Sequence, residues 1–168
     1  LDTPGHADFG GEVERIMHMV DGCVLLVDAF EGPMPQTRFV LKKALEAHIK
    51  PIVVINKIDR PNANPSRVVD EVLELFLELG APEEFLEFKV AYASALKGTS
   101  SLSDDPAKQV EGMEAILDLI LEEIPEPNVE RDGPFLFQPA LLDYNDFVGR
   151  IGIGVIKRGK LKVNDQVM

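Results

Sequence analysis

Three short apolar runs set the fold that this chain can adopt. They are rich in β-branched residues, continuous rather than alternating, and comprise Cys23-Val24-Leu25-Leu26-Val27, Pro51-Ile52-Val53-Val54-Ile55 and the weaker Phe88-Lys89-Val90-Ala91-Tyr92. Continuous apolar strands are typical of a parallel sheet that is buried on both faces. We therefore predict parallel strands over these three segments.

Helical patterns lie between the apolar runs. Apolar residues recur at helical spacing over residues 13–20, 40–45, 68–77 and 113–124. Asn64 is placed to cap the third helix, with Pro65 at its first position, and Gly80 to stop it. The alternation of strand and helix predicts a doubly wound, mostly parallel α/β fold with right-handed crossovers. Residues 94–105 are polar and small, and we expect a loop there.

The composition changes after the last predicted helix. Residues 125–134 are rich in proline and charged residues, which indicates a linker. Beyond it the apolar residues alternate, which predicts about three strands, too few to close a barrel. We expect residues 1–127 to be part of an α/β domain, 128–134 a linker and 135–168 the start of a β-barrel domain. Because the sequence opens on a loop motif and ends within a strand-like pattern, we expect a segment of a longer protein.

Composition and charge narrow the class of protein. Among the 168 residues there is no apolar run of the roughly 18 residues that a membrane span needs. The single cysteine, Cys23, fits a reducing compartment, and we expect a cytoplasmic protein with no membrane partner. A net charge of -12 argues against holding DNA or RNA by broad charge neutralisation, although a local basic patch remains compatible with it.

Polar residues follow each apolar run, where ligands bind in doubly wound sheets. Asp28 ends the first run, and Asn56-Lys57-Ile58-Asp59, the most informative motif, ends the second. A carboxylate at Asp59 can accept hydrogen bonds from the N1–H and the exocyclic amine of guanine. Adenine would leave it unpaired, at a cost of about 1–3 kcal/mol or more. Asn56 can bridge base and loop, and the stem of Lys57 can lie along the ring.

Two weaker motifs point to the same chemistry. In Asp2-Thr3-Pro4-Gly5 the carboxylate can hold a metal-bound water, and the backbone N–H of Gly5 can approach a terminal phosphate. His6 can orient an attacking water. After the third run, the backbone N–H of Ala95, next to Ser94, can donate to the guanine O6. Taken singly, these motifs are equally compatible with plain turns and a solvated histidine.

Together, the motifs at residues 2–6, 56–59 and 94–96 resemble the third, fourth and fifth guanine-nucleotide motifs of translational GTPases. The stretches 11–15, 28–38, 142–145, 152–154 and 157–160 are most similar to the TypA/BipA branch. The resemblance implies a ribosome-associated enzyme that binds GTP or GDP with Mg²⁺, and whose partners are rRNA and ribosomal proteins. The nucleotide-binding residues that it implies are Asp2, Gly5, Asn56, Lys57, Asp59, Ser94 and Ala95. Asp2 would reach the metal through water, and His6 would be the catalytic residue that positions the hydrolytic water.

The Walker A loop of that family, G-x-x-x-x-G-K-[ST], does not occur in this sequence. Residues 154–161 come near it, but Leu161 replaces the hydroxyl and the alternating context predicts a hairpin. We therefore expect this segment alone to fold poorly and to be inactive, and the full-length parent to hydrolyse GTP.

Two alternatives to this interpretation remain open. One is a nucleotide-free scaffold derived from a G domain, which binds the ribosome or a partner protein. The other is a different translational GTPase, such as an elongation factor G or LepA relative. The basic cluster formed by Lys157, Arg158, Lys160 and Lys162 fits either an rRNA contact or an exposed hairpin tip.

Overall fold

The larger sheet confirms the predicted α/β fold. The computed structural model of the protein describes Leu1 and residues 10–167. Its larger sheet has five strands in the order β1-β2-β3-β4-β5, of which the first three run parallel and the last two antiparallel. The strands are β1 (Gly22–Asp28), β2 (Lys50–Asn56), β3 (Val90–Ser94), β4 (Thr99–Ser101) and β5 (Val110–Glu111).

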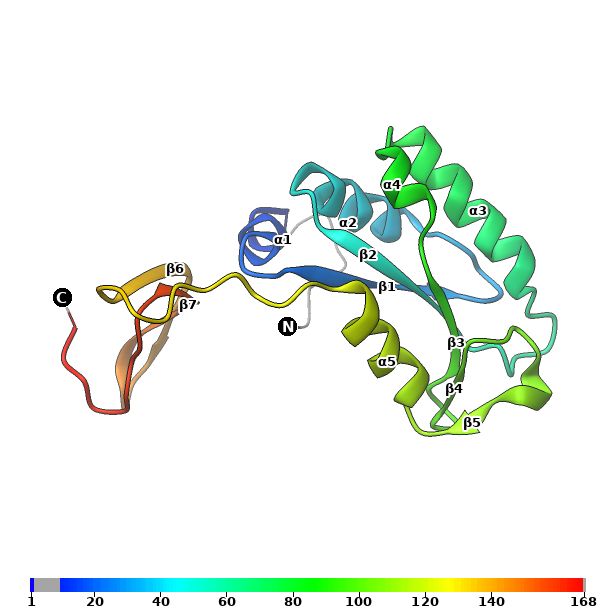
Figure 1. The fold of residues 1–168 in the computed structure, drawn as a ribbon. Coiled ribbons are helices and arrows are strands. Elements are labelled where there is room, and N and C mark those ends of the chain that lie inside the picture. Colours follow the sequence, from blue (N-terminus) through cyan, green and yellow to red (C-terminus); the bar gives the residue numbers. More distant parts are fainter. Residues whose placement is uncertain (2–9, 168) are drawn as a thin grey trace.

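Helices cover the two faces of this sheet unequally (Figure 1). They are α1 (Gly10–Met17), α2 (Pro35–Glu46), α3 (Pro65–Glu78), α4 (Glu83–Leu86), α5 (Glu114–Glu123) and the 3-10 turn η2 (Pro106–Lys108). On one face, α2, α3 and α4 bury a large core that includes Leu41, Phe76 and Phe85. On the other, α5 packs Ile116 and Leu119 against β2 and β3. The sheet is therefore a middle layer, as the doubly wound pattern predicts.

The ends of α3 follow the sequence signals. The side chain of Asn64 accepts a hydrogen bond from the backbone N–H of Arg67 at 3.1 Å, and Pro65 occupies the first turn. Gly80 lies just beyond the helix with a φ of 69°, a left-handed conformation that favours glycine. The predicted cap and stop are confirmed. The cap at Asn64 fixes the point at which the loop before α3 enters the helix.

Strand β1 lies at one edge of the sheet and is covered on one face only. Val24 and Leu26 are 43% and 59% exposed, although their register partners on β2, Ile52 and Val54, are buried beneath α5. In the described part of the chain, α5 reaches over β2 and β3 but leaves β1 open on that side. The expectation that the apolar strands are buried on both faces thus holds for β2 and is wrong for β1.

The segment 94–105, which we expected to be a loop, contains strand β4. After β3 the chain reverses through Gly98, whose φ is 64°, and pairs antiparallel with β3 from Thr99 to Ser101. The hydroxyl of Ser100 is buried and donates to the carbonyl of Gly112 at 2.9 Å. A polar residue can occupy a strand here because it finds a backbone partner.

A separate two-stranded sheet follows residues 125–134. It consists of β6 (Leu136–Asn145) and β7 (Gly149–Arg158), paired antiparallel. The hairpin interpretation of residues 154–161 is confirmed, because Gly154 pairs with Pro139. The expected third strand is wrong, because residues 161–165 form a turn in which the N–H of Asp165 donates to the carbonyl of Lys162 at 3.1 Å.

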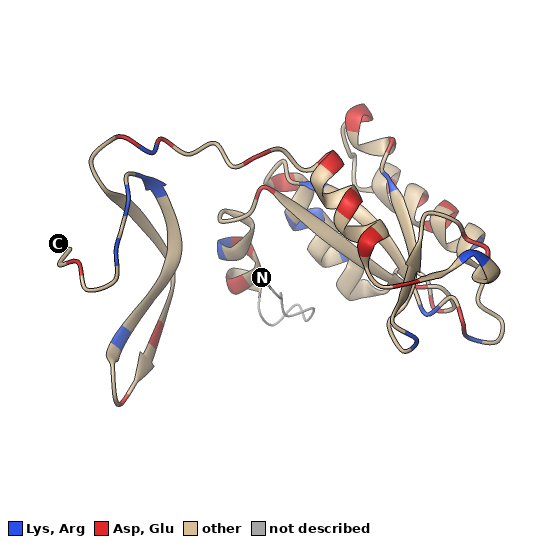
Figure 2. Cartoon of the chain, turned by 60° about the horizontal axis from the view of Figure 1, so that its bottom comes forward, with Lys and Arg blue, Asp and Glu red and all other residues tan. Residues whose placement is uncertain are grey.

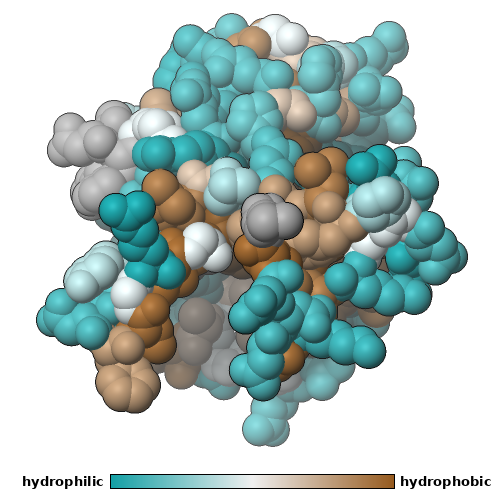
Figure 3. Space-filling view, turned by 90° about the vertical axis from the view of Figure 1, so that its left-hand side faces the viewer, coloured by the Kyte–Doolittle hydropathy of each residue, from teal (hydrophilic) through white to brown (hydrophobic). Residues whose placement is uncertain are grey.

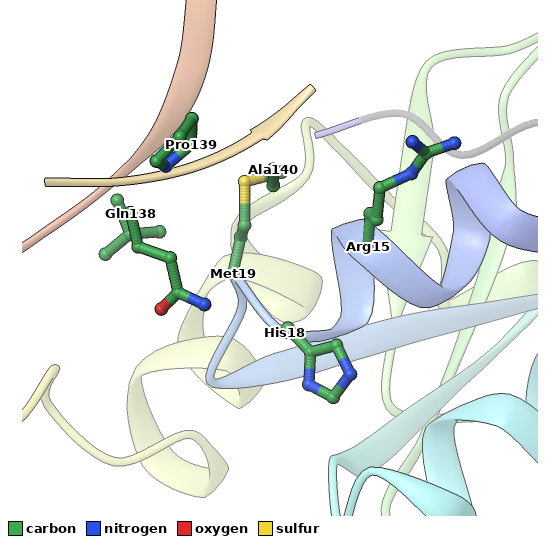
Figure 4. A pocket seen from close by; sticks show the side chains of 7 residues that line it. Arg15, His18, Met19, Gln138, Pro139 and Ala140 are labelled. Carbon is green, nitrogen blue, oxygen red and sulfur yellow. The ribbon is translucent and has the colours of Figure 1, made fainter. Parts of the chain in front are cut away.

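The hairpin has no buried core of its own. No described residue between 135 and 167 is fully buried, and Figure 3 shows apolar residues exposed at this end of the molecule. Its contact with the rest of the chain is made by β6 against α1. Between them lies a cavity of about 130 Å³, with Arg15, His18 and Met19 on one side and Gln138 and Pro139 on the other (Figure 4).

Candidate functional site

The predicted binding residues meet at the carboxyl edge of the parallel strands. Asp28, Asn56 and Ser94 are the last residues of β1, β2 and β3, and the register pairs Asp28 directly with Asn56. Lys57 and Asp59 follow β2, and Ala95 follows β3. Parallel strands of a doubly wound sheet bind ligands at this edge. The predicted residues Asp2, Gly5 and His6 lie outside the described residues.

Asn56 joins the two loops of this edge. Its side-chain Oδ1 accepts hydrogen bonds from the backbone N–H of Lys57 at 2.8 Å and from that of Ala95 at 3.0 Å. One amide oxygen therefore fixes the start of the loop after β2 against the start of the loop after β3. In this arrangement the N–H of Ala95 already has an acceptor, so donation to a ligand would require it to share or exchange that bond.

Lys57 has an unusual backbone and a specific side-chain partner. Its φ is 63°, a left-handed conformation that few non-glycine residues adopt and that is often found at functional sites. Its Nζ donates to Oδ2 of Asp28 at 2.7 Å, across from β2 to β1. The loop after β2 is thus tied to both neighbouring strands, through Asn56 on one side and Lys57 on the other.

Asp28 is a residue of this site whose role the sequence analysis did not predict. Its Oδ1 accepts from the backbone N–H groups of Phe30 at 2.9 Å and Glu31 at 3.3 Å, and its Oδ2 also lies 3.3 Å from Arg60. The side chain is only 14% exposed. Burial raises the pKa of the Asp28 carboxyl, but the hydrogen bonds from Lys57 and from the two N–H groups outweigh it and hold the pKa below its ordinary value.

Asp59 presents a charged acceptor at the same edge. It is partly exposed, and the hydroxyl of Ser94 beside it lowers the pKa of the Asp59 carboxyl below its ordinary value. Ser94 itself is 1% exposed, and its hydroxyl also accepts from the N–H of Lys97 at 3.3 Å. The carboxylate is therefore ionised at neutral pH and can only accept hydrogen bonds.

A cavity of about 320 Å³ opens beside Asp28 and Lys57. One wall is the loop after β1, which α3 holds in place: Arg67 donates to the carbonyl of Phe30 at 2.7 Å, and the N–H of Asn64 donates to the carbonyl of Ala29 at 2.9 Å. Both bonds hold backbone carbonyls of the loop, so these two contacts do not depend on the loop's own side chains. The sheet edge thus has a fixed wall and a row of polar side chains.

Within residues 10–167, no group of three His, Cys, Asp or Glu side chains is arranged to hold a metal ion. The Mg²⁺ prediction rests on Asp2, which lies outside the described part. None of the helices that the structure describes is long and apolar enough to cross a membrane.

Comparison with known proteins identifies the family. The family described as "Elongation factor Tu GTP binding domain" matches residues 1–126. The chain belongs to this GTP-binding domain family. Residues 127–168, which include the β6–β7 hairpin, lie outside the match. The polar edge described above belongs to the part that matches the GTP-binding domain.

Curated relatives confirm the predicted resemblance to the TypA/BipA branch. The chain is 65% identical over 167 residues to the large ribosomal subunit assembly factor BipA of Bacillus subtilis. It is 58% identical over the same length to BipA of Escherichia coli K12 and 55% identical to that of Haemophilus influenzae. In each case the match covers 99% of this chain and 27% of the relative. The chain therefore spans about a quarter of the length of these relatives.

A solved structure supports the fold of this family member. Translation elongation factor SelB of Methanococcus maripaludis, in complex with the GTP analogue GppNHp, superposes with a TM-score of 0.71 over 98% of this chain and 34% of its own. The sequences are 24% identical, so this likeness bears on the fold alone. It confirms the overall α/β fold described above.

Proposed function

We propose that this chain supplies the guanine-reading part of a BipA-like translational GTPase. The observation that carries the proposal is the convergence of Asn56, Lys57, Asp59, Ser94 and Ala95 at one edge of the sheet, together with the family match over residues 1–126. The five residues come from the ends of β2 and β3 and the loops that follow them, which are far apart in sequence. A site of this kind needs both loops in fixed positions, and Asn56 fixes them.

Base selectivity is assigned to Asp59. Its ionised carboxylate accepts from the N1–H and the exocyclic amine of guanine, while the apolar stem of Lys57 lies along the ring. Adenine offers an acceptor at the first position and no amine at the second, which leaves the carboxylate without donors. Such a mismatch costs about 1–3 kcal/mol or more, because the acceptor is charged. Ala95 contributes its N–H to the guanine O6 by sharing it with Asn56.

GTP hydrolysis is assigned to the full-length protein, with His6 positioning the attacking water. Gly5 would bring its N–H to the γ-phosphate, and Asp2 would hold Mg²⁺ through a water, where the ion supplies charge stabilisation during phosphoryl transfer. These three roles rest on the family resemblance. Residues 1–127 are proposed as part of the GTP-binding domain, 128–134 as a linker and 135–168 as the start of a β-barrel domain.

Ribosome association of the full-length protein is proposed from its relatives, which are named as large ribosomal subunit assembly factors. It implies a cytoplasmic protein with rRNA and ribosomal proteins as its partners. Acidic residues outnumber basic ones, and α5 carries acidic residues but no basic ones (Figure 2), so a broad electrostatic contact with rRNA is disfavoured. The basic cluster is not at the hairpin tip: Lys160 pairs with Asp132 at 3.6 Å, and Arg158 donates to the carbonyl of Pro134 at 3.0 Å.

The proposal is tested by nucleotide titration of the full-length protein. We expect GDP to bind at least about 100-fold more tightly than ADP, and Asp59→Ala to remove most of that preference. Lys97→Ala, which changes a neighbouring exposed residue, is the matched control and should keep it. Equal affinity for the two nucleotides in the unchanged protein, or a full preference in Asp59→Ala, would refute the proposal.

The 168-residue chain is also informative by itself. Its sequence contains no Walker A loop between a strand and a helix, so we expect GDP to bind weakly or not at all. Isothermal titration with micromolar affinity or better for this chain would contradict that expectation.

A further inference from the structure

We propose that Asp28 is a positioning residue for guanine-nucleotide binding, acting through Lys57. The inference rests on the proposed function and adds a residue from a third strand to the site. Asp28 ends β1, is the register partner of Asn56, and lies with Oδ2 2.7 Å from Nζ of Lys57. The contact joins the end of β1 to the loop after β2, so it is not part of the local turn of either loop.

The two oxygens of Asp28 have different partners. Oδ1 accepts from the N–H groups of Phe30 and Glu31 and so holds its own loop. Oδ2 faces two cations, Lys57 at 2.7 Å and Arg60 at 3.3 Å. One half of the carboxylate is structural and the other half is directed at Lys57. A neutral amide in its place would keep an oxygen for the loop and lose the charge that faces the ammonium.

Lys57 benefits from a fixed partner because its side chain is long and 44% exposed. A four-carbon stem with many rotamers must lose conformational freedom when it lies along a base. A charge-assisted hydrogen bond to a carboxylate that is 14% exposed restricts those rotamers before the ligand arrives. Such preorganisation raises affinity without adding any contact between Asp28 and the nucleotide.

Arg60 is a second cation near Asp28, so the charge of the carboxylate attracts Lys57 and Arg60 alike. Its Nη1 lies farther from Oδ2 than the ammonium does, and its side chain is 46% exposed. Both cations belong to the loop after β2, so Asp28 attracts the loop as a whole and holds the lysine most closely. Replacement of Arg60 should therefore weaken nucleotide binding less than replacement of Asp28.

The experiment measures the affinity of the full-length protein for a fluorescent GDP analogue. We expect Asp28→Asn to weaken binding about 10-fold, with a modest fall in the thermal midpoint of unfolding, because the ionised carboxylate also stabilises the fold. In a Lys57→Met background, Asp28→Asn should weaken binding less than about twofold, because its effect passes through the lysine. Glu78→Gln removes the partner of Arg38 at the far end of α3 and is the matched control, with unchanged affinity expected.

The outcomes separate this inference from the proposed function. Failure of the unchanged protein to prefer GDP over ADP refutes the proposed function. A normal preference combined with unchanged affinity in Asp28→Asn overturns the role of Asp28 alone. If Asp28→Asn weakens binding equally in the unchanged protein and in the Lys57→Met background, Asp28 acts by holding the loop after β1, and the proposed action through Lys57 is overturned. If Asp28→Asn does not fold, Asp28→Ser, whose hydroxyl can still accept from the loop, gives the same test.

Discussion

Lys50 at the start of β2 forms an ion pair with Glu123 in the last turn of α5. The pair joins the sheet to the helix that covers its second face, at the end opposite the polar edge. Glu123 is 12% exposed and Lys50 33%, so the charges are largely removed from water. The next residue, Ile124, packs against the apolar cluster between α5 and the sheet, which includes Ile116 and Leu119.

Glu123→Gln should therefore lower the free energy of unfolding. The change leaves the ammonium of Lys50 without its charged partner in a partly buried position. We therefore expect the free energy of unfolding to fall by about 1–3 kcal/mol, measured by urea unfolding of the full-length protein. Glu122→Gln removes a neighbouring exposed carboxylate and is the control, with a change within about 0.5 kcal/mol. Equal effects of the two changes would show that the Lys50 contact contributes nothing.

Gly32→Ala should destabilise the wall of the cavity beside Lys57. Gly32 has a φ of 75°, and a Cβ there would lie 2.3 Å from the carboxylate of Glu71. Gly80 has a φ of 69° with open space around it, so Gly80→Ala carries the backbone strain alone. We expect Gly32→Ala to lower the unfolding free energy by about 1 kcal/mol more than Gly80→Ala. Identical losses would mean that Glu71 moves aside freely.

Acid should release the contacts of Asp28. A carboxyl whose pKa is lower in the folded than in the unfolded protein stabilises the fold above its unfolded pKa, and loses that contribution as the pH falls through the folded pKa. The ordinary value is 3.8, so the contribution is complete at pH 7 and is lost below about pH 4. In urea unfolding at a series of pH values, Asp28→Asn should show a shallower acid limb. A limb of the same slope would contradict this assignment.

Cys23 should react slowly with thiol reagents. Burial within β1 raises the pKa of its thiol from 9.0 to about 11. At pH 8 the thiolate fraction is then about 100-fold lower than for an unperturbed cysteine, and alkylation of the native protein should slow by that factor or more. The same reagent in 6 M urea serves as the reference. Native alkylation at the denatured rate would show that β1 is not packed as described.

The sequence was sufficient for elements whose signals are local. The runs at 23–27 and 51–55 predicted parallel strands because they are short, continuous and apolar, although only β2 is covered on both faces. Asn64 and Gly80 act within a few residues of the helix that they bound. The short strand β4 was not predicted, because its Ser-rich sequence has no apolar pattern and the segment forms a strand by pairing with β3. The third barrel strand was wrong because Leu161 and Val163 have no neighbouring strand among the described residues.

The position of the candidate site was predictable from the order of residues along the chain. Asn56, Lys57 and Asp59 were expected directly after a strand and lie there, at the end of β2, while their guanine-binding role stays a prediction. Asp28 could not be assigned a role, since its contact with Lys57 spans 29 positions in sequence and depends on how β1 and β2 align. The hydrogen bond from the N–H of Ala95 to Asn56 could not be predicted either, because it depends on how the loops after β2 and β3 lie relative to each other.

The register that pairs Asp28 with Asn56 decides whether the carboxylate of Asp28 reaches Lys57. Successive side chains of a strand point to opposite faces, so a slip of one residue between β1 and β2 would turn the Asp28 side chain to the other face of the sheet, away from the lysine. We therefore expect a misaligned strand to lose the ion pair with Lys57, and with it the preorganised lysine that we propose for nucleotide binding.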